Sequence, residues 1–182
     1  NSDRVIPWEG GRYVRLQIAT DITDLKEAES RLQYLATHDP LTCLPNRQLF
    51  DDRLKHALGL ASRAECRVAL LFLDLDGFKE VNDRHGHQAG DELLQAVAGR
   101  LQEAVREVDT VARIAGDEFA VILEKAQDTE AARIVAERVR CQLVRLTITA
   151  SIGIACFPED ARSPEELLRL ADQAMYRAKA GG

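Results

Sequence analysis

Two short stretches place carboxylates at points where predicted strands end. Residues 67–73, RVALLFL, form a continuous apolar run typical of a buried strand, and Asp74 and Asp76 follow it directly. Side chains alternate along a strand, so these two acids are expected on one face. Asp117 and Glu118 lie in a short link between two β-rich runs. Carboxylates that meet repel one another unless a cation lies between them, and such oxygen ligands suit Mg²⁺ or Mn²⁺.

The link also has a simpler interpretation. Apolar alternation in residues 108–114 and 119–123, on either side of Ala115 and Gly116, predicts a β-hairpin. A hairpin tip needs turn residues, which glycine and aspartate supply, so the stretch alone is equally compatible with a solvated turn. The acids that follow the neighbouring buried strand favour the metal site.

These stretches resemble the GGDEF domains of diguanylate cyclases. The hairpin sequence RIAGDEF is similar to the family signature, with Ala115 in place of the first glycine. Residues 38–47, HDPLTCLPNR, resemble the opening motif, with Cys43 where glycine is usual. Residues 74–94 match the central segment and residues 174–179, AMYRAK, resemble the closing motif. The motifs occur in register from His38 to the end of the chain, so a chance match is excluded in practice.

The resemblance implies an enzyme that condenses two GTP molecules into cyclic di-GMP and releases pyrophosphate. Each 3′-hydroxyl attacks the α-phosphorus of the other nucleotide, so catalysis depends on positioning, charge neutralisation and metal ions. By matching positions, the implied catalytic residues are Lys79, Asp117 and Glu118. The implied ligands of Mg²⁺ or Mn²⁺ are Asp74, the Leu75 carbonyl, Asp117 and Glu118. The implied GTP-binding residues are Phe78, Lys79, Asn82, Asp91, Gly116 and Lys179.

Several of these positions have a second interpretation. Asn82 and Asp91 match the family's guanine-binding pair, because an amide and a carboxylate complement the edge of that base. Asp91 alternatively only caps its helix. Asp76 alternatively holds its loop or caps the short helix after it, and we favour that role over metal binding. Gly116 lets the backbone approach phosphate, and the two lysines would neutralise the triphosphate.

Arg106 and Asp109 form an RxxD sequence that ends shortly before Ala115. The resemblance places an inhibitory site for the product, cyclic di-GMP, at this position. An arginine stacks on guanine and forks onto its edge or onto a phosphate. The alternative is a surface ion pair between residues three apart.

Ala115 is the main departure from the family pattern. An alanine at a positive φ costs about 1 kcal/mol or more, whereas a position that needs only a small side chain accepts it. The remaining site residues favour an active, dimeric enzyme. One alternative is a degenerate GGDEF module that binds GTP or cyclic di-GMP and regulates a neighbouring domain. Another is a dimerisation unit.

Composition narrows the class of protein. The 182 residues carry a net charge of −6 and are 46% hydrophobic, which argues against a nucleic-acid-binding surface and predicts one cored domain with an appendage. The four scattered cysteines favour a reduced, cytoplasmic compartment. No apolar run approaches the roughly 20 residues of a membrane span, and no signal peptide is evident. We expect a segment of a longer protein, whose other parts can be membrane-associated.

The order of elements predicts an α+β fold, with a central, mostly antiparallel sheet flanked by helices. The resemblance implies the palm-like fold of nucleotidyl cyclases. Strands are expected at residues 67–73, 108–114, 119–123 and 146–156. Helices are expected from Asn46 to about 61, near 78–82, at 91–106 and 129–143, and from Ser163 onward.

Residues 1–22 are expected to be the C-terminal remnant of a PAS-like sensor domain, and residues 38–182 the GGDEF domain. Residues 1–11 look irregular, 12–19 alternate like a single strand, and 21–24, DITD, resemble a PAS ending. Residues 23–37 predict a signalling helix, with Asp24 and Glu27 as a capping box. Its apolar residues follow heptad spacing, which fits pairing of two copies or packing on its own domain. These residues are Leu25, Ala28, Leu32 and Leu35.

Overall fold

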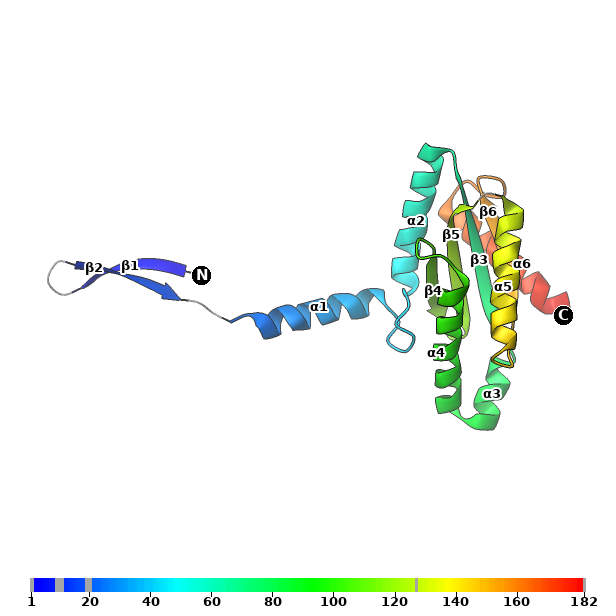
Figure 1. Ribbon diagram of the computed structural model, residues 1–182, viewed down its shortest axis with the longest axis horizontal. Coiled ribbons are helices and arrows are strands. Elements are labelled where there is room, and N and C mark those ends of the chain that lie inside the picture. Colours follow the sequence, from blue (N-terminus) through cyan, green and yellow to red (C-terminus); the bar gives the residue numbers. More distant parts are fainter. Residues whose placement is uncertain (1, 9–11, 19–20, 127, 182) are drawn as a thin grey trace. The chain divides into compact units, whose positions relative to one another are not determined.

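The computed structural model describes residues 2–8, 12–18, 21–126 and 128–181, which form two compact units, residues 1–36 and 37–182 (Figure 1). In the first unit, β1 (Ser2–Trp8) pairs antiparallel with β2 (Arg12–Ile18). The prediction of an irregular segment before a single strand is therefore wrong. Pro7 has no N–H to donate, but in a two-stranded sheet both strands are edges and tolerate it.

Helix α1 (Thr23–Thr37) begins one residue before the predicted cap. Asp21 Oδ1 instead accepts hydrogen bonds from the Thr23 N–H, at 2.9 Å, and from Thr23 Oγ1, at 2.6 Å. Asp24 lies inside the first turn, and the Glu27 and Ala28 side chains lie outside the described residues. Leu25 and Leu32 are exposed, and pairing through this stripe stays a prediction.

The second unit is built on a four-stranded sheet in the order β4-β5-β3-β6. These strands are β3 (Arg67–Asp76), β4 (Thr110–Ala115), β5 (Glu118–Ala126) and β6 (Thr149–Phe157). Every neighbouring pair is antiparallel, so the predicted α+β fold with an antiparallel sheet is confirmed. Strand β3 runs three residues past its predicted end, because β5 and β6 continue to pair with it as far as Asp74 and Asp76.

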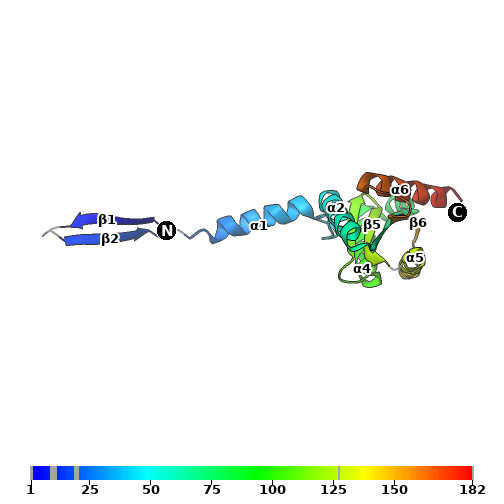
Figure 2. The ribbon, with the colours of Figure 1, turned by 90° about the horizontal axis from the view of Figure 1, so that it is seen from above.

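Two layers of helices cover the sheet (Figures 1 and 2). Helices α4 (His87–Ala104) and α5 (Thr129–Val144) pack on the face that carries Leu71, Leu73 and Leu75. Helices α2 (Arg47–Ala64) and α6 (Pro164–Gly181) pack on the face of Leu70 and Phe72. The short α3 (Phe78–His85) follows β3 and packs against α4. No helix in the described part of the chain is long and apolar enough to cross a membrane.

Capping side chains that the sequence predicted stabilise the starts of two helices. Asn46 caps α2 by accepting from the Leu49 N–H at 3.1 Å, as predicted. Ser163 Oγ accepts from the Glu166 N–H at 3.1 Å at the start of α6.

Gly153 of β6 lies directly under α6, because a Cβ there would be 2.0 Å from the Ala171 carbonyl oxygen. Strand β6 and helix α6 therefore touch backbone to backbone.

Candidate active site

The predicted acids gather at one end of the sheet. The register places Asp74 of β3 opposite Glu118 of β5 and, on its other side, opposite Ser151 of β6. The Asp117 carbonyl accepts a hydrogen bond from the Leu75 N–H at 3.3 Å, which ties the hairpin tip to β3. The four implied metal-binding positions thus lie together at this end of the sheet, and their role in binding a metal stays a prediction.

The charges at this end of the sheet are crowded. Burial raises the pKa of Glu118, and the charges of Asp74, Asp172 and Asp117 raise it further against the opposing effect of Arg47. Lys179 of α6 places its Nζ 2.5 Å from Asp74 Oδ1. The hydrogen bond to Asp74 raises the pKa of Lys179, so the lysine stays charged. Lys179, predicted to bind phosphate, here neutralises the buried Asp74.

The donor set at this end fits a hard divalent cation. Among the described residues, no three Asp, Glu, His or Cys side chains already converge on a single cation position. Asp74, Asp117 and Glu118 nevertheless supply carboxylates whose mutual repulsion a cation would relieve. One oxygen of Asp74 is taken by Lys179, so a cation bound here would compete with this lysine for it.

Asp76 has a different role from Asp74. Its two carboxylate oxygens accept from Thr149 Oγ1 and Ser151 Oγ, each at 2.8 Å. Gly77 precedes α3 without a side-chain cap, so Asp76 does not cap that helix. Asp76 therefore ties β3 to β6, in line with the interpretation that it holds the local structure.

The predicted guanine-binding pair lies where α3 meets α4. A Cβ at Gly90 would be 2.0 Å from Asn82 Oδ1 and 3.3 Å from Phe78 Cζ, so only glycine allows this approach. Asp91 follows Gly90 and is exposed. Helix α4 begins at His87, so Asp91 sits inside the helix and the capping alternative is wrong. The junction therefore packs the Asn82 side chain of α3 against Gly90 of α4, one residue before Asp91.

The turn tolerates Ala115, and the costly departure lies elsewhere. Ala115 is the last residue of β4 and pairs with Glu118, and only Gly116 of this turn has a positive φ, 46°. The alanine is therefore nearly free of backbone strain. Cys43, at the second usual glycine position, has a φ of 58° and carries the strain instead. Lys79 is exposed in the first turn of α3.

Sequence reasoning missed Arg113, which holds the turn between β4 and β5. Its Nε and Nη2 donate to the Gly116 carbonyl at 2.9 and 2.8 Å, and its Nη1 donates to Asp39 Oδ1 at 3.0 Å. Burial works to raise the pKa of Asp39, but hydrogen bonds from Thr42 and Arg113 outweigh it, and that pKa lies below its usual range. Arg113 lies in the RIAGDEF motif and Asp39 in the HDPLTCLPNR motif. Their place in these motifs was the feature of the sequence that could have singled them out.

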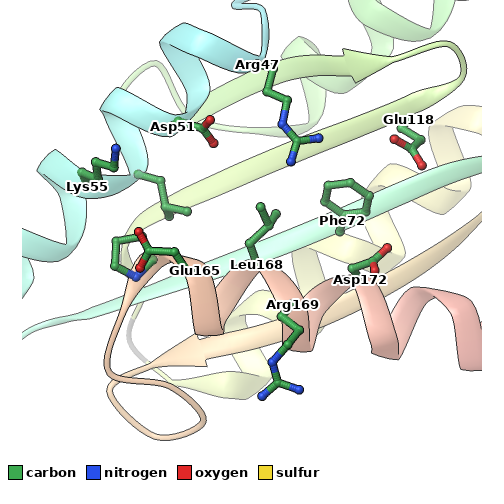
Figure 3. A pocket seen from close by; sticks show the side chains of 11 residues that line it. Arg47, Asp51, Lys55, Phe72, Glu118, Glu165, Leu168, Arg169 and Asp172 are labelled. Atoms are coloured by element: carbon green, nitrogen blue, oxygen red, sulfur yellow. The ribbon is translucent and has the colours of Figure 1, made fainter.

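A groove of about 540 Å³ runs between α2 and α6 and reaches Glu118 at one end (Figure 3). Its charged walls come from both helices, and Phe72 and Leu168 form part of its apolar lining. The charged residues are Arg47, Asp51, Lys55, Glu165, Arg169 and Asp172. Of the predicted site residues, Glu118 is the one that lines this groove in the described part of the chain. Arg47 was not singled out by sequence, although its charge acts on Glu118.

The RxxD sequence lies at the other end of the hairpin. Asp109 accepts from the Arg106 N–H at 2.9 Å and from the Glu124 N–H at 3.1 Å. Within the described residues no ion pair joins the Arg106 guanidinium to Asp109, so the surface-pair alternative is wrong. Arg106 and Asp109 line a depression together with Lys125 and Arg138. Arg138 lies on α5, too far along the chain for sequence spacing to suggest it.

A family model described as "Diguanylate cyclase, GGDEF domain" matches residues 36–182. The chain is 46% identical over 177 residues to the bifunctional diguanylate cyclase/cyclic di-GMP phosphodiesterase MucR of Pseudomonas aeruginosa, covering 92% of this chain and 26% of MucR. It is 44% identical over 164 residues to the diguanylate cyclase TpbB of the same species, covering 85% of this chain and 38% of TpbB. The chain thus spans well under half the length of these relatives.

Solved structures agree with this match. The GGDEF domain of TpbB superimposes with a TM-score of 0.77 at 44% identity, covering 80% of this chain and 90% of that one. The coiled coil and GGDEF domain of DgcB from Caulobacter crescentus, in complex with c-di-GMP, gives a TM-score of 0.80 at 31% identity and covers 88% of this chain and 90% of that one. The chain therefore belongs to the diguanylate cyclase GGDEF domain family.

Proposed function

We propose that this domain is an active, metal-dependent diguanylate cyclase, which condenses two GTP molecules into cyclic di-GMP and releases pyrophosphate. The observation that carries the proposal is the crowded end of the sheet. Asp74 and Glu118 face each other across β3 and β5, beside Asp117 at the hairpin tip. Glu118 is held among other acids at the expense of its own ionisation, and a carboxylate perturbed in this way indicates a function rather than stability.

The residues divide the task between them. Asp74, the Leu75 carbonyl and Asp117 would hold Mg²⁺ or Mn²⁺, with Glu118 as a further ligand. When bound, the cation polarises phosphate oxygens and helps to ionise the attacking 3′-hydroxyl. Lys79 and Lys179 neutralise the triphosphate, and the exchange of Lys179 from Asp74 to phosphate frees the carboxylate oxygen that it occupies.

The α3–α4 junction would select guanine. Asn82 offers an amide and Asp91 a carboxylate, and the close contact through Gly90 keeps their helices in register. Phe78 packs against the same glycine and fixes the start of α3. Gly116, without a side chain, leaves room for a phosphate beside the turn.

Turnover would require two copies of the domain, because each copy presents one GTP and the product is two-fold symmetric. The exposed Leu25 and Leu32 of α1 support a homodimer in which this helix signals from a PAS-like sensor in residues 1–22. A cytoplasmic location follows from the use of GTP. The depression at Arg106 would bind the product and inhibit the enzyme, and DgcB, a structural relative, was solved with c-di-GMP.

A second candidate is a regulatory module that binds GTP or cyclic di-GMP without turnover. Relatives named as cyclic di-GMP phosphodiesterases support it, such as NbdA of Pseudomonas aeruginosa, 37% identical over 169 residues. Incubation of the dimeric chain with GTP and Mg²⁺ separates the two candidates. Formation of cyclic di-GMP and pyrophosphate supports the enzyme. Saturable binding of GTP with no product would contradict it.

A further inference from the structure

The catalytic turn depends on a contact made from outside the hairpin. Gly116 has a φ of 46°, and glycine is the residue with the widest choice of backbone conformations. The pairing of β4 with β5 is irregular between Arg113 and Ala115, so the ladder that would hold the turn is interrupted just before it. The turn that carries Asp117 therefore needs another constraint.

Arg113 supplies that constraint with its whole side chain. Two of its nitrogens donate to the Gly116 carbonyl and a third donates to Asp39. A peptide group is planar, so fixing the Gly116 carbonyl also fixes the Asp117 N–H, which points the opposite way. The orientation of the peptide before Asp117 is thus set by Arg113.

The anchor on the far side of Arg113 is rigid. Asp39 Oδ1 also accepts from the Thr42 N–H at 2.8 Å and from Thr42 Oγ1 at 2.7 Å. The Asp39 N–H donates to the Leu44 carbonyl at 2.8 Å, and the Arg113 N–H donates to the Pro45 carbonyl at 3.0 Å. The Arg113 and Asp39 side chains are only 13% and 20% exposed, so water screens this pair weakly.

We propose that Arg113 is a positioning residue for the reaction, which holds the Gly116–Asp117 peptide against the loop of residues 38–46. The inference rests on the proposed function. Asp39 acts through Arg113, as its anchor. Their effect is to keep the Asp117 carboxylate where the reacting groups meet.

The test compares Arg113→Ala with Arg140→Ala in the full chain. Arg140 also makes a two-nitrogen ion pair, with Glu137, but on exposed helix α5. A misplacement near 1 Å costs about 100-fold in rate, so kcat of Arg113→Ala should fall about 100-fold while the KM for GTP changes by less than about threefold. Arg140→Ala should match the parent. Added guanidinium ion, below denaturing concentration, should restore part of the rate to Arg113→Ala alone.

A second readout does not depend on activity. Amide hydrogen exchange in residues 116–118 should become about tenfold faster in Arg113→Ala and stay unchanged in Arg140→Ala. If Arg113→Ala does not fold, Arg113→Lys keeps a charge near Asp39 but cannot make all three bonds, and it should show the same changes in weaker form.

Two outcomes would overturn the positioning role. One is a folded Arg113→Ala variant with the exchange and kcat of the parent. The other is a loss of rate that comes entirely from KM. If the parent itself makes no cyclic di-GMP, the proposed function fails, and the exchange measurement still decides whether Arg113 holds the turn.

Discussion

The two ends of the β4–β5 hairpin use aspartate in opposite ways. At the open end, both oxygens of Asp109 accept backbone N–H groups, from Arg106 and Glu124. Beside the tip, Asp74 of the neighbouring strand β3 faces another carboxylate, Glu118, and is neutralised by a lysine from a separate helix. A carboxylate whose partners are backbone N–H groups stabilises the local fold. A carboxylate whose partner is the end of a long side chain can exchange that partner for another. The acid at the open end therefore holds the local backbone, and the acids near the tip are the groups to which the proposed function assigns the reaction.

The sharpest test of this contrast is Asp117→Asn. Asparagine keeps the shape of the side chain but removes its charge, so affinity for the cation should fall and turnover should drop by about 10²-fold or more. Thermal unfolding should stay close to that of the parent, because the side chain is only half-buried. Rates under Mg²⁺ that equal the parent would remove Asp117 from the proposed catalytic set.

At the open end, Arg106→Ala should act on product binding. Its guanidinium makes no ion pair with Asp109, and we expect it to serve cyclic di-GMP. Calorimetry should show at least about a tenfold weaker affinity, since charge-assisted hydrogen bonds are lost, and inhibition by added product should disappear. Arg100→Ala, which removes an exposed ion pair on α4, is the control. Equal affinities in the two variants would mean that Arg106 does not bind cyclic di-GMP.

Asp109→Ala should instead reduce stability. Its loss leaves the N–H groups of Arg106 and Glu124 without their acceptor, which should lower the free energy of unfolding by about 1–3 kcal/mol. Urea unfolding measures this difference. A variant as stable as the parent would show that water replaces the carboxylate, and the contrast with the tip would then fail.

Glu118→Gln should have the smallest effect of these substitutions. It should raise the free energy of unfolding, whereas Asp109→Ala lowers it. The pKa of Glu118 is raised above 4.5 in the folded chain. Between pH 4.5 and that raised pKa, the folded chain therefore keeps a proton that the unfolded chain has lost. Stability of the parent therefore falls as pH rises from 4.5 through the folded pKa. The variant should be the more stable protein at pH 7, and the difference should vanish below pH 4.5. Parallel stability curves over the whole range would contradict the crowding at the tip.

Local signals in the sequence were sufficient for most of the fold. Asn46 and Ser163 were recognised as helix starts because a cap acts within three residues. The strand β1 was missed because Pro7 and nearby glycines suggested irregular structure, while pairing with β2 decides the outcome. Tertiary pairing likewise lengthened β3 as far as Asp76.

The site was predicted as a set of positions but not as a set of contacts. The family motifs singled out Asp74 and Asp117, and the structure places them at the same end of the sheet. Arg113 and Arg138 were missed because their roles depend on loops and helices distant in the chain. Lys179 was singled out for phosphate, and its partner in the structure is Asp74, a pairing between α6 and β3 that sequence spacing does not show.

The backbone contact at Gly153 has a mechanical consequence. A Cβ there would lie 2.0 Å from the Ala171 carbonyl oxygen and 2.2 Å from the Met175 nitrogen. The backbone of α6 therefore rests directly on β6 at this residue. Lys179 lies one helical turn beyond Met175, roughly 6 Å along the axis. Because the helix is rigid over this short distance, a small tilt of α6 at Gly153 also moves Lys179. Any side chain larger than hydrogen at position 153 would lift the helix and with it the ammonium group that Asp74 relies on.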